Sequence, residues 1–151
     1  MARTPCLTHA AELKPIGHPC YGQTVSESIA NLDHQIILAR DNVESAEFLT
    51  GILGLAASGR QSIFTTVMLG NQTTILFKTV QTDFPGQHYA FRVSAKAFRT
   101  ILQRVQARGI AFWSTPQGGG VGETYELNGE TGFYFHDPSG HQLEVLTDTG
   151  V

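Results

Sequence analysis

Two histidines and one glutamate have the residue types and the spacing expected of a metal site. His34 and His88 each open a strand-like run, and Glu144 lies within a third, "HQLEVLT". The intervals are nearly equal, with 54 residues from His34 to His88 and 56 from His88 to Glu144. Two imidazoles and one carboxylate on a common face would leave coordination positions open for water or substrate, the arrangement preferred by Fe²⁺, Mn²⁺ and Zn²⁺.

Glu144 is the most informative of the three residues. Its neighbours Leu143 and Val145 are apolar, and a carboxylate in such a strand is costly unless it is paired, protonated or metal-bound. Strand alternation turns Glu144 away from the face that carries Leu143 and Val145. The alternative for Glu144 is a salt bridge to an arginine such as Arg92. A single strand histidine is more often a core or rim residue, so the three residues carry more weight together than singly.

The segments that carry these residues follow one another in the same order twice. A strand run is followed by a helical run, with Asp41 or Asn42 placed to cap the first helix and Gly54 to end it, and then by further strand runs. We interpret this order as an internal duplication of a βαβββ module, at about residues 31–80 and 86–147. The predicted fold class is therefore α+β, with the two modules forming one cupped mixed sheet around the metal site.

The duplication also predicts how the ligands meet. If the two sheets form one cup, the first strands of the modules lie side by side near a pseudo-twofold axis. His34 and His88 would then face each other, and Glu144 would point into the same cup.

Composition restricts the class of protein. The chain has 151 residues, 41% hydrophobic and 15% charged residues and a net charge of −3, which predicts a single globular domain at 30–148 and no nucleic-acid partner. No apolar run reaches the roughly 20 residues that span a membrane, so no membrane partner and a cytoplasmic location are expected. Residues 1–29 are typical of a tail, and both cysteines, Cys6 and Cys20, fall within it.

Three stretches together resemble the vicinal oxygen chelate superfamily of glyoxalases, fosfomycin-resistance enzymes, extradiol dioxygenases and bleomycin-binding proteins. They are "LDHQIILARDNVESAEFLTGILGL", "HYAF" and "GFYFHDPSGHQLEVLT", and the resemblance covers about residues 31–147. It implies a paired βαβββ fold, commonly a homodimer, whose divalent metal chelates a small-molecule substrate through adjacent oxygens. The superfamily's ligand positions fall on His34, His88 and Glu144. The metal would be Fe²⁺, Mn²⁺, Zn²⁺ or Ni²⁺.

Three differences between this sequence and known members of the superfamily restrict the reactions that it could catalyse. The strand "TTILFK" lacks the fourth, carboxylate ligand of glyoxalases, which disfavours a lactoylglutathione isomerase. Extradiol dioxygenases also have a tyrosine at the position of Tyr134, but no histidine lies between His88 and Tyr134 to act as their acid-base catalyst. Fosfomycin-resistance transferases have a lysine and two serines where this chain has Thr124, Asn128 and Gly132.

Two further residues are candidates for catalysis. Tyr134 would hydrogen bond or transfer a proton to bound substrate, against the alternative of aromatic packing, and Arg92 would clamp an anionic or carbonyl oxygen, against the alternative of reaching solvent. The favoured hypothesis is a metalloenzyme that uses Lewis-acid activation for addition, isomerisation or lyase chemistry. The alternatives are an extradiol-type dioxygenase and a metal-free binding protein of the bleomycin-resistance type. The segment 116–123, "PQGGGVGE", is either a lid or a long hairpin connection.

Overall fold

The computed structural model describes residues 30–147. The segment 1–29 that the sequence assigns to a tail, with Cys6 and Cys20, lies outside the described residues, as do residues 148–151. The domain boundaries expected from the sequence therefore stay a prediction.

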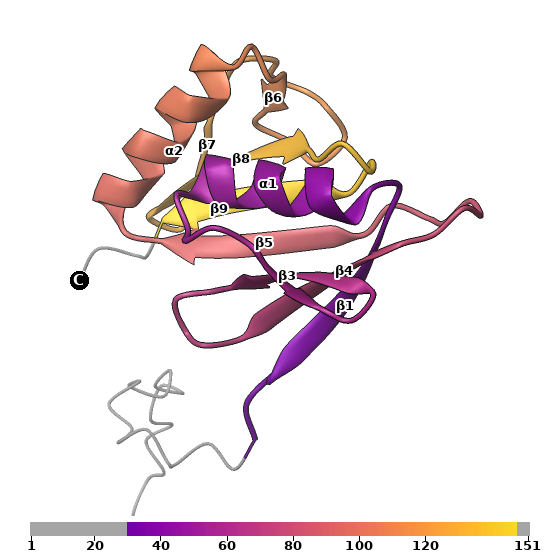
Figure 1. Cartoon of the computed structure of the whole chain (residues 1–151). Helices are drawn as coiled ribbons and strands as arrows, with labels where there is room; N and C mark the ends of the chain where they lie inside the picture. Colours follow the sequence, from indigo (N-terminus) through magenta and orange to yellow (C-terminus); the bar gives the residue numbers. More distant parts are fainter. Residues whose placement is uncertain (1–29, 148–151) are drawn as a thin grey trace, which may run out of the picture. The chain divides into compact units, whose positions relative to one another are not determined.

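The first module forms a four-stranded mixed sheet, sheet A, with the strand order β1-β4-β3-β2; Figure 1 shows β1, β3 and β4 lying together. Its elements are β1 (His34–Ala39), α1 (Asn42–Leu53), β2 (Gly59–Gln61), β3 (Phe64–Met68) and β4 (Thr74–Thr79). β1 runs parallel to β4, and the other neighbours are antiparallel. The sequence does not locate β2, because its three residues are polar or glycine and all exposed, so they show no alternation.

The second module repeats this plan in sheet B, with the order β5-β9-β8-β6 and β7 paired to β8. Its elements are β5 (His88–Val93), α2 (Ala95–Ala107), β6 (Phe112–Trp113), β7 (Tyr125–Leu127), β8 (Glu130–His136) and β9 (Gln142–Thr147). β5 runs parallel to β9, as β1 does to β4. The duplicated α+β fold predicted from the sequence is confirmed. One expectation is corrected: within the chain the modules form two separate sheets, with β1 and β5 each at a sheet edge.

Helix α1 begins and ends where the sequence places its caps. The Asp41 side chain accepts hydrogen bonds from the backbone N–H groups of Val43 and Glu44, and Gly54 ends α1 in the left-handed conformation at φ 74°. The Ser94 side chain caps α2 by accepting a hydrogen bond from the backbone N–H of Ala97. Within residues 30–147, neither helix has the length and apolar character needed to cross a membrane.

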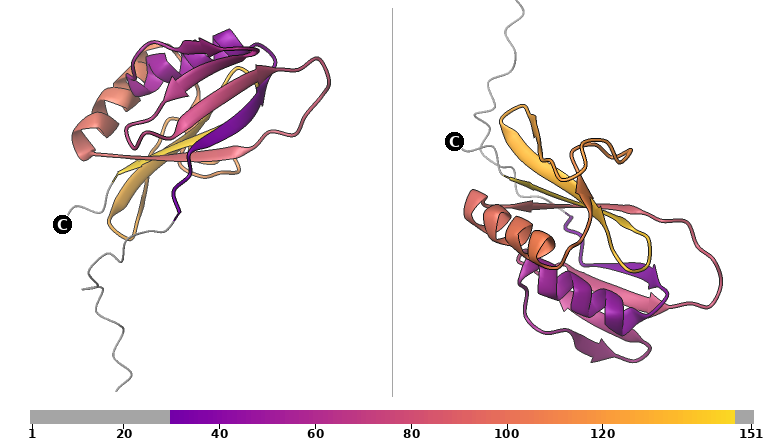
Figure 2. Two further views of the ribbon diagram at one scale, coloured as in Figure 1. Left: turned by 60° about the horizontal axis from the view of Figure 1, so that its bottom comes forward. Right: turned by 90° about the horizontal axis from the view of Figure 1, so that it is seen from above.

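A single hydrophobic core joins the two modules, and Figure 2 shows α1 of the first module next to α2 of the second. α1 and α2 contact each other, and Phe48 of α1 packs on Phe135 of β8 with ring centroids 6.2 Å apart. The fully buried His141 adds a polar link: its Nε2 donates to the Leu38 carbonyl at 2.7 Å, and its Nδ1 accepts from the Gln87 N–H at 3.1 Å. Both ring nitrogens are therefore used within the protein, which explains a buried histidine without assigning it a metal.

The turn before β9 is built around a partly buried carboxylate. Asp137 Oδ1 accepts hydrogen bonds from the backbone N–H groups of Ser139 (3.0 Å) and His141 (2.8 Å). Burial raises the pKa of Asp137 above its ordinary value of 3.8, although these hydrogen bonds act in the opposite direction. The folded protein therefore holds the Asp137 proton more tightly than the unfolded chain does.

We expect the substitution Asp137→Asn to change the pH dependence of stability. The amide oxygen keeps both hydrogen bonds, but it does not titrate. Because the folded-state pKa is raised, wild type gains stability relative to the variant as pH falls toward 3.8 and loses it as pH rises through the raised pKa. The free energies of unfolding in urea, measured for both proteins between pH 4 and pH 7, test this. A stability difference that is constant over the range would contradict it.

Candidate metal centre

The strand register of sheet B places the candidate residues on one exposed face. Ala90 of β5 and Tyr134 of β8 are the direct neighbours of Glu144 on β9, one on each side. His88 lies two residues before Ala90 and therefore shares its face. Leu143 and Val145, on the opposite face, are buried in the core. The orientation that strand alternation predicts for Glu144 is confirmed.

His88 and Glu144 form a pair on this face. Nε2 of His88 lies 3.0 Å from Oε2 of Glu144, and the side chains are 46% and 12% exposed. Metal–ligand distances of about 2.0–2.2 Å place two ligand atoms at right angles on one ion about 3.0 Å apart. The two atoms thus have the separation of adjacent ligands. Ala90, beside Glu144, has only a methyl group, so its side chain takes little space on this face.

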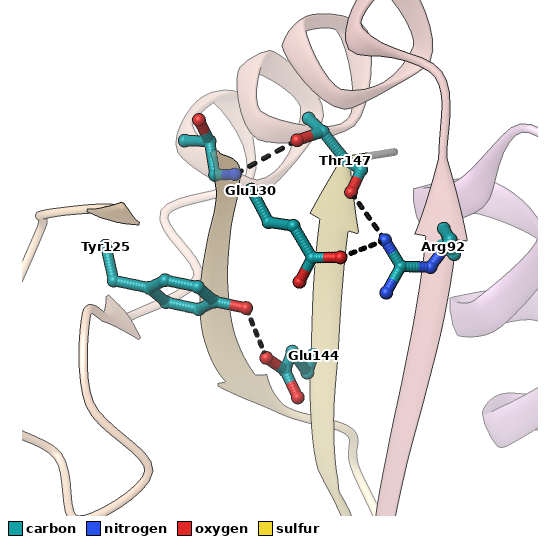
Figure 3. A network of polar contacts seen from close by, with 6 residues as sticks. Arg92, Tyr125, Glu130, Glu144 and Thr147 are labelled. Atoms are coloured by element: carbon teal, nitrogen blue, oxygen red, sulfur yellow. Dashed lines mark hydrogen bonds and ion pairs between the residues drawn. The ribbon is translucent and has the colours of Figure 1, made fainter. Parts of the chain in front are cut away.

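The second carboxylate oxygen is held by a residue that the sequence analysis did not select. The hydroxyl of Tyr125, on β7, donates to Oε1 of Glu144 at 2.5 Å (Figure 3). The Tyr125 ring stacks on the Tyr134 ring, with centroids 5.6 Å apart. Burial, and then the hydrogen bond to Glu144, raise the pKa of both phenols. Glu144 is therefore contacted by the His88 imidazole on one oxygen and by the Tyr125 phenol on the other, and the neighbouring Tyr134 is a further hydrogen-bond partner of the carboxylate.

A signal for Tyr125 is present in the sequence. Asn128 and Gly129 form a two-residue turn with positive φ at both positions, the Asn-Gly pair typical of a tight hairpin. This turn pairs Leu127 with Glu130 and therefore Tyr125 with Gly132. In that register Tyr125 lies opposite Gly132, whose neighbour on β9 is Leu146, and Glu144 follows two residues away on the same face of β9.

Arg92 is engaged in contacts within the protein. Its Nη1 lies 2.5 Å from Oε1 of Glu130 and 2.9 Å from the Thr147 carbonyl (Figure 3). The arginine that was the alternative partner of Glu144 is thus bound to Glu130. A substrate anion at Arg92 would compete with that carboxylate, and the role of Arg92 as a clamp stays a prediction.

His34 lies apart from the pair. It is on β1 of sheet A, where its Nδ1 contacts Oδ2 of Asp33 at 2.7 Å, and it lines a hollow with Ile36, Phe64 and Leu76. Between residues 30 and 147, no three His, Cys, Asp or Glu side chains come together in a group that could hold a metal. The structure thus brings together two of the three predicted ligands within one chain and leaves the third on the other sheet.

Comparison with known proteins identifies the relatives of this chain. Residues 31–145 match the model of the family described as the Glyoxalase/Bleomycin resistance protein/Dioxygenase superfamily. The glutathione transferase FosA of Serratia marcescens is 27% identical over 123 residues, which are 78% of this chain and 80% of FosA.

Two solved structures are more similar in sequence. The oxidase ChaP-H1 is 38% identical with a TM-score of 0.77, over 79% of this chain and 96% of its own. The oxidase ChaP-H2 is 36% identical with a TM-score of 0.78, over 81% of this chain and 99% of its own.

Proposed function

Because the chain belongs to the glyoxalase, bleomycin resistance protein and dioxygenase superfamily, we propose that it is a metal-dependent oxidase of a small molecule that carries neighbouring oxygen atoms. The observation that carries the proposal is the His88–Glu144 pair, two ligand atoms 3.0 Å apart on the exposed face of sheet B. Oxidation is ranked above the additions and isomerisations that the sequence favours, because the two oxidases share more of this sequence than the transferase does.

His88, Glu144 and a third ligand, His34, would hold the metal. A divalent ion at such a two-histidine, one-carboxylate site keeps coordination positions open and supplies Lewis-acid activation of substrate oxygens and, for iron, reaction with dioxygen. Tyr134, whose ring lies 6.1 Å from the His88 ring, would donate a hydrogen bond to a substrate oxygen on the same face. Tyr125 holds Glu144 in place through a hydrogen bond, and Glu130 holds Arg92 in place through an ion pair.

A second copy of the chain would supply His34. β1 is an edge strand, and the apolar side chains that follow His34 on its outer face, Ile36 and Leu38, are 43% and 36% exposed. Edge strands with exposed apolar residues are prone to pair with another chain. If β1 of one copy lies beside β5 of the other, His34 approaches the His88–Glu144 pair of its neighbour, and the apolar residues become covered.

The lining of the His34 hollow mixes apolar and polar residues and disfavours an anionic substrate, because Asp33 supplies a carboxylate there. Ile36, Phe64 and Leu76 supply its apolar part, and of the described residues that line it none is a lysine or arginine. A phosphonate or other strong anion would find no cation there, and Arg92 on the other sheet is already paired with Glu130. Thiol transfer to a phosphonate, suggested by the FosA relative, is the second candidate and is disfavoured on this ground.

Metal loading and nitric oxide binding test the proposal. We expect about one iron or manganese per chain in protein purified without chelators, lost in His88→Ala and kept in His136→Ala. His136 is a matched control, because it is an exposed histidine of the same sheet whose ring contacts Trp113. Protein loaded anaerobically with Fe²⁺ should bind nitric oxide, a stand-in for dioxygen, and give the electron paramagnetic resonance signal of a ferrous nitrosyl.

Two other results of these measurements would indicate a different function. Bound metal without a nitrosyl signal, together with addition of glutathione to fosfomycin, would replace the oxidase with the transferase. Protein that neither contains metal nor takes it up would favour a metal-free binding protein of the bleomycin-resistance type.

A further inference from the structure

Tyr125 reaches Glu144 only because residue 132 has no side chain. Tyr125 and Gly132 are direct neighbours in the β7–β8 pairing, and Glu144 lies on the strand beyond. A Cβ atom placed on Gly132 would collide with the Tyr125 ring at Cζ, Cε1 and the hydroxyl oxygen. The phenol therefore crosses β8 directly over the glycine, and Figure 3 shows its hydroxyl directed at Glu144. Any larger residue at position 132 would displace the ring.

The contacts of Glu144 assign different partners to its two oxygens. Oε1 accepts the Tyr125 hydroxyl at 2.5 Å, and Oε2 lies 3.0 Å from Nε2 of His88. The Tyr125 ring is itself fixed by stacking on Tyr134 at 5.6 Å between centroids, and β7 is tied to β8 by the Asn128–Gly129 turn. The fixed Tyr125 phenol, by binding Oε1, thus determines that Oε2 of Glu144 is the oxygen that faces His88.

We propose that Tyr125, seated over Gly132, is a positioning residue that holds Glu144 as a one-oxygen metal ligand. The inference rests on the proposed metal site and adds a residue to it. With Oε1 engaged by the phenol, only Oε2 is available to the ion, which leaves one more coordination position for substrate or dioxygen. Hydrogen-bond partners of ligating carboxylates orient the ligand, and their removal typically lowers metal affinity about 10–100-fold.

Cobalt titration of the full-length protein tests the role of Tyr125. Co²⁺ is used as the probe because its visible absorption weakens as the coordination number rises. We expect Tyr125→Phe to lower the Co²⁺ affinity about 10-fold or more and to weaken the visible bands, because the released carboxylate binds through both oxygens. Gly132→Ala, which displaces the ring, should do the same. Tyr89→Phe is the matched control, since its phenol bonds to Gln87 and its ring contacts the buried His141.

The outcomes separate this inference from the metal site itself. Wild-type protein that takes up no Co²⁺ would overturn the site and the inference with it. Wild-type uptake with unchanged affinity in Tyr125→Phe would overturn only the positioning role. A loss of affinity with unchanged visible bands would mean that Tyr125 supports the site structurally, and would overturn the one-oxygen assignment.

Discussion

The substitution Glu144→Gln is expected to lower the affinity for Fe²⁺ or Mn²⁺ at least about 100-fold, because it removes the only anionic ligand of the proposed site. The fold should remain. Glutamine can accept the Tyr125 hydrogen bond at one end and donate its amide to Nε2 of His88 at the other, which preserves both contacts of the native side chain. The free energy of unfolding of the metal-free protein should therefore change by no more than about 1 kcal/mol.

Isothermal titration calorimetry gives the affinity, and urea unfolding of the metal-free proteins gives the stability. Glu130→Gln is the matched control: Glu130 is also a carboxylate of sheet B, on β8, but it pairs with Arg92 rather than with His88. We expect that control to bind metal as wild type does. Full metal stoichiometry and affinity in Glu144→Gln would show that Glu144 is a structural carboxylate and that the site lies elsewhere.

Mixed dimers of two defective chains are expected to recover one metal site per dimer. One chain carries His34→Ala and the other carries Glu144→Gln, and each is expected to bind metal weakly when alone. If His34 of one copy completes the His88–Glu144 pair of the other, the mixed dimer has one site with all three ligands and one site that lacks two. The expected result is one tightly bound ion per mixed dimer, measured by mass spectrometry on dimers purified through two different tags.

The converse dimer provides the control. A wild-type chain paired with a chain that carries both His34→Ala and Glu144→Gln should bind no metal tightly, because each shared site then lacks one ligand. Sites built within single chains would give the opposite pattern, with one ion in this dimer and none in the first. A wild-type protein that is monomeric in solution would also contradict the shared site.

Local features of the sequence were sufficient to predict one face of the site and most of the elements, but not β2. Asp41 and Gly54 mark the ends of α1 through hydrogen bonds and a backbone conformation that involve only near neighbours in the chain. Alternation in β9 places Glu144 opposite Leu143 and Val145, because successive side chains of a strand point to opposite faces. The duplicated order of strand, helix and strands, and hence the fold class, follows from the same short-range patterns.

The pairing between distant residues was decided only by the tertiary structure. Whether Arg92 binds Glu144 or Glu130 depends on side-chain reach across three strands, and the approach of Tyr125 to Glu144 depends on the absence of a side chain at Gly132. Neither of these two contacts follows from the alternation of side chains along a single strand.

The separation of His34 from the other two candidate ligands was also decided by the tertiary structure. The intervals between His34, His88 and Glu144 suggest a common site, and sheet B does bring His88 and Glu144 together by parallel pairing of β5 with β9. His34 has the equivalent position in sheet A, but the two sheets are joined through the core and helices rather than edge to edge. The sequence by itself determined which residue types lie on which strand faces, because that depends on local periodicity. Only the packing of the modules decided which of these faces meet within one chain, because that depends on the contacts of the whole core.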